Sequence, residues 1–259
     1  MLVGVVETWV VGQLGLPSLA ALSLVFPSII LMQNMASGSL GGSVAALVSQ
    51  ALGRGRPVEA SVITYHGLLI GGVLGAVFLV LYLAFGRWLY GMLGGRDEVL
   101  DIATRYSFVV MGTLPVMWWS LVMSAVLRGT GNMRLPARIT LLAAAAQIAL
   151  GLTLGLGLGP LPSLGMVGVA LAQVTPMLAA AAYLYWHVSN GLAPVRLRID
   201  GRRPRLQAAV FIAILRPAGI AFMNPLLAML IIMLIGRLVA QHGVEALAAF
   251  GIGTRLEML

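Results

Sequence analysis

The sequence predicts an all-α protein, a polytopic bundle of transmembrane helices. Of its 259 residues, 60% are hydrophobic and only 9% are charged, and the mean hydropathy is +1.00. A soluble domain carries roughly a quarter of its residues as charged groups. This chain cannot cover its surface in that way, so the surface must face lipid. The 32 glycines are typical of closely packed membrane helices.

Six apolar runs are long enough to cross a bilayer, which takes about 20 residues. They lie at 18–49, 60–86, 103–127, 136–157, 165–188 and 207–236. They are too long for membrane strands, which need about 10 residues. Two shorter runs, 1–14 and 244–259, are interpreted as incomplete helices. The run 1–14 is too short to span the bilayer, and it lacks the basic region and the cleavage site of a signal peptide. We therefore expect the chain to be a fragment of a longer protein.

Arginines alternate between the connections and predict the orientation of the bundle. Three connections carry the basic residues: Arg54 and Arg56; Arg128, Arg134 and Arg138; Arg196, Arg198, Arg202, Arg203 and Arg205. The intervening loops are uncharged or balance arginine with acids, so the arginine-rich ones are predicted to be cytoplasmic. The net charge of +8 is thereby explained by topology, with the lipid bilayer as the partner and no nucleic acid.

An internal repeat predicts two related halves. "VGQLGLPSLAALSLV" at 11–25 aligns with "IGRLVAQHGVEALAAFGIG" at 235–253 when four residues are inserted in the second copy. Gly12 then pairs with Gly236, a period of about 225 residues that contains six spans. We predict a six-helix N-terminal lobe at 1–190, an arginine-rich linker at 191–206, and the start of a repeated C-terminal lobe at 207–259.

The run "LVGVVETWVVG" places one carboxylic acid, Glu7, among apolar residues. A carboxylate near the bilayer centre costs roughly 2.5–3.5 kcal/mol, so it normally faces a cavity or a partner. Burial disfavours the charged form of such a group. A proton and a metal cation then compete for the same oxygens, which is what an antiporter requires. The alternative is that Glu7 lies near a membrane face.

Several segments together resemble the multidrug and toxic compound extrusion (MATE) family of cation-coupled exporters. They are "VVETWVVGQLGLPSLAAL", "SGSLGGSVAALVSQALGRGRPVEA", "VLRGTGNMRLP", "GLGPLPSLGMVGVALAQV" and "GVEALAAFGIGTRLEML", in the order of the family. The resemblance implies twelve helices in two lobes, of which the first eight are partly or wholly present. It implies no cofactor and a coupling ion, H⁺ or Na⁺. It also places Glu7 at the position of the coupling acid, usually Asp.

Two glutamines complete the cation site that the resemblance implies. Thr140, Ala144, Gln147 and Gly151 share one helix face by their spacing. In the family this face often reads Asn-x-x-x-Asp, so Gln147 takes the Asn position, Gly151 takes the Asp position, and the second acid is absent. Gln173 stands where Thr is usual. A single carboxylate favours a proton over Na⁺ as the bound ion. The alternative for each Gln is a hydrogen bond between helices that only holds the bundle together.

Four further residues are candidates for a substrate cavity: Gln33, Asn34, Trp118 and Asn224. A tryptophan can stack on a flat organic cation, and the amides can donate and accept hydrogen bonds. Helix packing or lipid contact is the alternative for Trp118. The stripe Gly67-x-x-x-Gly71-x-x-x-Gly75 is predicted to be a packing seam, with a packed histidine, His66, beside it.

Enzymatic chemistry finds no support in the sequence. It lacks a P-loop, a G-x-S-x-G motif and a His/acid pair at metal spacing, and without cysteine it has no thiolate metal site. The predicted function is an inner-membrane antiporter, monomeric when full length, that exports organic, cationic or amphipathic compounds. One alternative is a lipid-linked oligosaccharide flippase, which would need cavity arginines for pyrophosphate; only Arg216, near a helix end, qualifies. The other is an intramembrane enzyme.

Overall fold

The structure is a computed structural model that describes residues 2–158, 163–197 and 204–257. Every regular element in these ranges is helical, which confirms the all-α prediction. The elements are α1 Leu2–Gln13, α2 Leu16–Asn34, η1 Met35–Leu40, α3 Gly41–Gly53, α4 Pro57–Met92, α5 Asp97–Met111, α6 Leu114–Gly129, α7 Arg134–Leu150, η2 Gly151–Gly155, α8 Gly165–Ser189, α9 Ala208–Ala240 and α10 Val244–Glu257. The two η segments are π-helical.

The six predicted spans are all present in the described part of the chain. Five are long, apolar helices, of which the first joins α2, η1 and α3 over Leu16–Gly53. The sixth is the pair α5 and α6, which bends by 51° at its break. The helix predicted at 103–127 is therefore present as two helices that meet at a bend. Pro115 stands in the first turn of α6, where it has no N–H to continue the hydrogen-bond ladder of α5.

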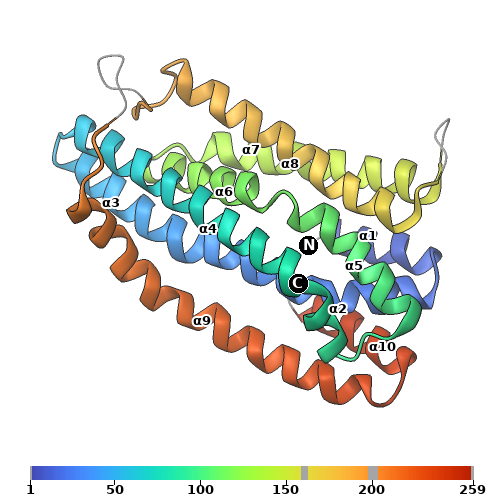
Figure 1. Ribbon diagram of the computed structural model, residues 1–259. Coiled ribbons are helices and arrows are strands. Elements are labelled where there is room, and N and C mark those ends of the chain that lie inside the picture. The colour runs from blue at the N-terminus through green and yellow to red at the C-terminus, as the bar shows by residue number, and fades with distance from the viewer. Residues whose placement is uncertain (1, 159–162, 198–203, 258–259) are drawn as a thin grey trace.

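Successive connections lie at opposite ends of the bundle, as Figure 1 shows. The turn between α3 and α4, the turn between α6 and α7, and the segment between α8 and α9 gather at one end, which we name the arginine-rich end. Its described arginines are Arg54, Arg56, Arg128, Arg134, Arg138, Arg196 and Arg205. Arg198, Arg202 and Arg203 lie outside the described residues. The predicted alternation is confirmed.

The outer surface of the long helices is apolar. On α4, Val80 is 64% exposed, and on α9, Ile220 is 74% exposed. Trp88 lies exposed near the C-terminal end of α4, and Tyr185 and Trp186 lie exposed near the C-terminal end of α8. Exposed aliphatic side chains between two belts of aromatic rings are the pattern of a surface solvated by lipid. The chain is therefore a multi-pass membrane protein.

The glycine stripe on α4 is a packing seam, as predicted. A Cβ built at Gly67 would lie 2.7 Å from Val44 of α3, and one built at Gly75 would lie 2.7 Å from the Cα of Pro115. At Gly71 the nearest atom would belong to Val122 of α6, at 3.2 Å. The absence of side chains at these positions lets α4 approach its two neighbours closely.

His66 is a packed histidine, also as predicted. Its ring is fully buried, and its Nδ1 lies 2.8 Å from the carbonyl oxygen of Val62. Its Nε2 accepts a hydrogen bond of 3.0 Å from the backbone N–H of Gln207, immediately before α9. Nearby, the backbone N–H of Arg196 donates to the Ser61 hydroxyl. Two polar side chains of α4 thus hold the segment that connects α8 to α9.

The sequence repeat corresponds to a structural repeat. Gly15 precedes α2 with φ +105°, and its repeat partner Gly243 precedes α10 with φ +104°. In both copies the carbonyl of this glycine accepts the first helical hydrogen bond, from Leu19 and from Leu247, at 3.2 Å. A left-handed backbone at both positions explains why glycine is repeated there.

The two copies also face each other. Helices α2 and α10 pack together, and a Cβ at Gly251 would collide with the side chain of Ser23. Ser23 and Gly251 are partners in the same alignment, each eight residues beyond the left-handed glycine. Equivalent residues in contact are expected where two repeats meet about an approximate twofold axis. The division into lobes at 190 and 206 stays a prediction.

The packing seam can be tested with two neighbouring glycines. Gly75→Ala should lower the free energy of unfolding by about 1–3 kcal/mol, because the added methyl group meets the backbone of Pro115. Gly72→Ala, with nothing within 4 Å, should be neutral or slightly stabilising, because alanine favours the helix. Thermal unfolding in detergent measures both. Equal changes in unfolding temperature for the two variants would contradict the role of Gly75 in close helix packing.

Candidate functional site

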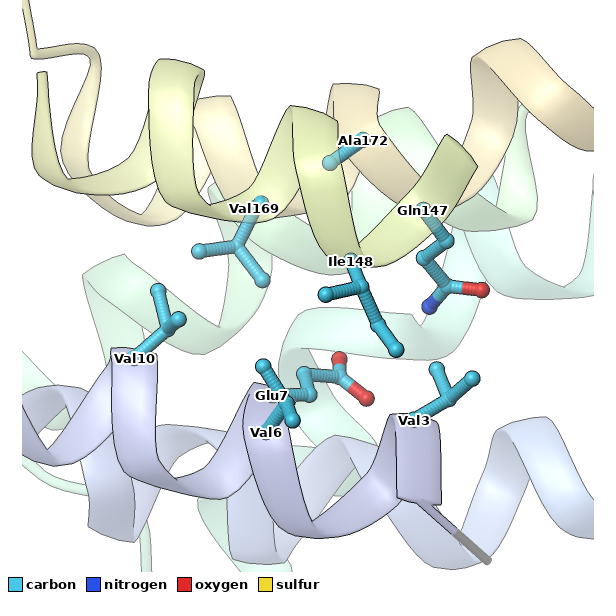
Figure 2. Close-up of a pocket in the computed structure, with 9 residues that line it drawn as sticks. Val3, Val6, Glu7, Val10, Gln147, Ile148, Val169 and Ala172 are labelled. Carbon is cyan, nitrogen blue, oxygen red and sulfur yellow. The ribbon is translucent and has the colours of Figure 1, made fainter. Parts of the chain in front are cut away.

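Glu7 lies on α1 and points into a small cavity between α1, the end of α7 and α8 (Figure 2). The cavity is lined by Val3, Val6, Glu7, Val10, Gln147, Ile148, Gly151, Val169 and Ala172. Its volume is about 10 Å³, close to the minimum that holds one water molecule. Such a space suits a proton, a water molecule or a small ion, and it excludes an organic compound.

The predicted cation-site residues are brought together. Glu7, Gln147 and Gln173 are each half-buried, and they come from α1, α7 and α8. In Figure 2 the Gln147 amide and the Glu7 carboxyl group point into the same space. Of the predicted face at 140–151, Gln147 and Gly151 both line the cavity. Three segments far apart in sequence therefore meet at one acid.

Tyr106 of α5 joins two of these residues. Its hydroxyl oxygen lies 3.1 Å from Glu7 Oε1 and 2.9 Å from Gln173 Oε1. The tyrosine is fully buried, so these partners take the place of water. A phenol has one proton to donate, and it can give that proton to only one of the two oxygens at a time.

This arrangement can serve both protonation states of the carboxyl group. When Glu7 is ionised, Tyr106 donates to the carboxylate, and the Gln173 amide can turn its NH₂ group toward the phenol oxygen. When Glu7 is protonated, it can donate to the phenol oxygen, and Tyr106 then donates to Gln173 Oε1. The hydrogen bonds reverse their direction, and the only heavy atoms that must move are the Gln173 amide oxygen and nitrogen, which exchange places.

Glycines and a π-helical segment position the walls of the cavity. Helix α7 continues into η2 at Gly151, and π-helical turns within helices are frequent at functional sites. A Cβ at Gly155 would lie 3.0 Å from Val10 of α1, and one at Gly168 would overlap the backbone of Leu154. The backbones of α1, η2 and α8 can therefore approach closely around Glu7.

The candidates for a substrate cavity lie apart from this site. Gln33 is half-buried and Asn34 is exposed at the end of α2, next to η1, which packs against α9. Asn224, on α9, is also exposed. Their role as cavity residues stays a prediction.

Trp118 differs from the expectation that its ring offers a face to a bound compound. It is 0% exposed and packs against Phe78 and Phe222, with ring centroids 5.4 and 6.4 Å away. In this structure the ring belongs to the core between α4, α6 and α9, which is the packing alternative. Contact with two other aromatic rings favours that buried place.

Sequence reasoning missed Tyr106. Its spacing from Ala103 and Val110 puts the three on one face of α5, and all are buried. That periodicity signals a ring that points inward from its helix. It does not identify Glu7 and Gln173 as the partners, because their distance from Tyr106 depends on how the three helices α1, α5 and α8 pack.

The comparison with known families decides the identity of the chain. The family model described as MatE matches residues 1–153, more than half of the sequence. The chain belongs to the MatE family. The resemblance of the sequence motifs is thereby confirmed.

Named relatives agree with the family. The chain is 31% identical to the FAD transporter of Shewanella oneidensis over 97% of its own length and 55% of that protein. It is 26% identical to the probable multidrug resistance protein YoeA of Bacillus subtilis, over 92% of this chain and 52% of the relative. The chain thus spans about half the length of the relatives it matches.

A solved structure confirms the fold. The inward-facing conformation of a multidrug resistance MATE family transporter superposes with a TM-score of 0.90 at 22% identity. The match covers 99% of this MatE chain and 57% of the solved chain. A helix bundle of this topology is therefore the MATE fold over the part of the family that the chain represents.

The bridge through Tyr106 can be tested by removing one oxygen. Tyr106→Phe should lower the free energy of unfolding by about 1–3 kcal/mol, because Glu7 and Gln173 lose a buried partner. Tyr183→Phe removes the same atom from an exposed ring of α8 and should have little effect. Thermal unfolding in detergent compares the pair. If the unfolding temperature falls no more for Tyr106→Phe than for Tyr183→Phe, the bridge does not stabilise the bundle.

Proposed function

We propose that the complete protein is a proton-coupled antiporter of the inner membrane that exports organic compounds, with Glu7 as the proton-binding group. The observation that carries this proposal is the bridge from Glu7 through Tyr106 to Gln173, which begins at the acid that lines a cavity large enough for about one water. Membership in the MatE family supports transport over the intramembrane enzyme. The arginine-rich end faces the cytoplasm in this proposal, by the distribution of positive charge.

A proton fits the site better than Na⁺. A hard metal cation gathers several oxygen ligands, and carboxylates bind it most strongly. Here one carboxylate is accompanied by two amides and a phenol, and Gly151 stands where the family resemblance implies a second acid. A proton needs only one carboxyl oxygen and a hydrogen-bond partner, and Tyr106 is that partner.

Coupling follows from the helices that the bridge connects. Protonation of Glu7 reverses the hydrogen bonds of Tyr106 and Gln173, which lie on α5 and α8, while Glu7 itself lies on α1. A group that binds a proton more tightly in one arrangement of these helices biases the equilibrium toward that arrangement. Export then requires that the organic compound binds best to the opposite protonation state.

Two substrate classes follow from different observations. Organic cations and amphipathic drugs are the class that the family resemblance implies, and YoeA carries a multidrug name. The relative named FAD transporter, at 31% identity, makes a flavin dinucleotide the second candidate. A dinucleotide is anionic, so it requires cationic contacts that a drug cation would avoid. Arg216, two turns into α9 and exposed, is one residue able to supply such a contact.

The coupling role of Glu7 is tested by dye efflux from cells that express the complete gene. Glu7→Gln keeps the shape and a hydrogen-bonding group but cannot change charge. Coupled efflux should therefore fall by roughly tenfold or more. The control is Glu59→Gln, which changes an exposed acid that pairs with Arg56 on the surface, and it should retain efflux. Retained efflux in Glu7→Gln would exclude Glu7 from coupling.

The coupling ion and the substrate are separated in everted vesicles from the same cells. Uptake driven by an imposed pH gradient, with no response to a Na⁺ gradient, is the expected result. The opposite dependence would overturn the choice of proton. Parallel assays with a fluorescent organic cation and with FAD then assign the substrate class, because each compound should be moved only if the cavity complements its charge.

A further inference from the structure

A groove on the surface of the bundle shares no lining residue with the cavity at Glu7. It has a volume of about 480 Å³. Its lining comes from α4, α6, α8 and the segment that follows α8: Tyr65, Leu68, Leu69, Gly72, Val73, Trp119, Tyr185 and Leu197. Leu69 and Val73 are exposed, and the Trp119 and Tyr185 rings meet at 6.0 Å to join α6 to α8. The walls are therefore apolar and aromatic.

The depth of the groove matches one leaflet of a bilayer. Helix α4 has 36 residues, a length of about 54 Å, so about 12 Å would project beyond each side of a hydrocarbon core of about 30 Å. Tyr65 lies eight residues into α4, at the expected boundary of that core, where tyrosine is typical. Val73 lies about 12 Å deeper. The groove thus runs from the interface inward along the path of an acyl chain.

Positive charge lies at the mouth of the groove. Arg196 is exposed and directly precedes Leu197, which lines the groove. Its backbone is fixed, because its N–H donates to the Ser61 hydroxyl at 3.0 Å. The one acid of the α4 first turn, Glu59, pairs with Arg56. The arginine is therefore placed at the level of lipid headgroups and is able to attract an anionic one.

We infer that this groove binds one acyl chain of an anionic glycerophospholipid from the leaflet at the arginine-rich end, with the phosphate near Arg196. The apolar and aromatic walls accept the chain, and the arginine selects the headgroup charge. The inference does not depend on Glu7 or on the exported compound. A bound lipid would fill the space between α4 and α8 and hold the segment that leads to α9.

Native mass spectrometry of the complete, detergent-purified protein tests the inference. Phosphatidylglycerol and phosphatidylcholine with the same acyl chains are titrated separately. The first adduct should form about fivefold more tightly with phosphatidylglycerol, the ratio expected for one arginine beside an anionic headgroup. Equal affinities would overturn the selection of charge. Displacement of the adduct by glycerol 1-phosphate would show a headgroup site alone and overturn the role of the groove.

Two variants with matched controls separate the groove from the charge. Gly72→Leu should abolish the first adduct, because position 72 has open space that leucine would fill. Gly219→Leu, at an equally open glycine on α9, should leave it unchanged. Arg196→Gln should remove the preference for phosphatidylglycerol but keep the adduct, whereas Arg216→Gln should keep both. If Gly72→Leu unfolds, Val73→Phe fills the groove from an exposed position. A first adduct unchanged by the groove-filling variants would overturn the inference.

Discussion

The structure around the first helix depends on one constraint, the burial of a carboxyl group within an apolar bundle. Glu7 can remain half-buried because Tyr106 provides a hydrogen bond from a fully buried position on α5. Gln173 holds the same phenol from α8. An unpartnered polar group in a membrane would cost several kcal/mol. The need to satisfy the acid therefore determines which faces of α1, α5 and α8 meet.

Small residues allow the helices to pack closely, both around Glu7 and elsewhere in the bundle. Glycines at 155 and 168 bring the backbones of α1, η2 and α8 close to the acid, and those at 67 and 75 do the same for α4 against α3 and α6. In a membrane, close backbone approach replaces the hydrophobic driving force between helices. The cavity at Glu7 is consequently small, which restricts it to a proton, a water or a small ion.

The connection between the repeats rests on different groups. His66 and Ser61, both on α4, accept backbone hydrogen bonds from the segment before α9, so the start of the second repeat is tied to the first. At the opposite end, α2 meets α10 through residues that are equivalent in the two repeats. Helix α9 therefore lies along α2, η1, α3 and α4. A movement of the second repeat would have to break or adapt these contacts.

The sequence by itself determined the number of spans, the end at which arginines gather, the repeat, and the presence of one acid within the apolar run of the first helix, because hydropathy, charge and glycine spacing act locally along the chain. The helical spacing of Gln147 and Gly151 in the sequence also indicated that both lie on one face of their helix. Only the tertiary structure decided that Tyr106 bridges Glu7 and Gln173, that the span at Pro115 bends, and that Trp118 is core. These depend on distances between helices that are remote in sequence, and side-chain packing alone sets such distances.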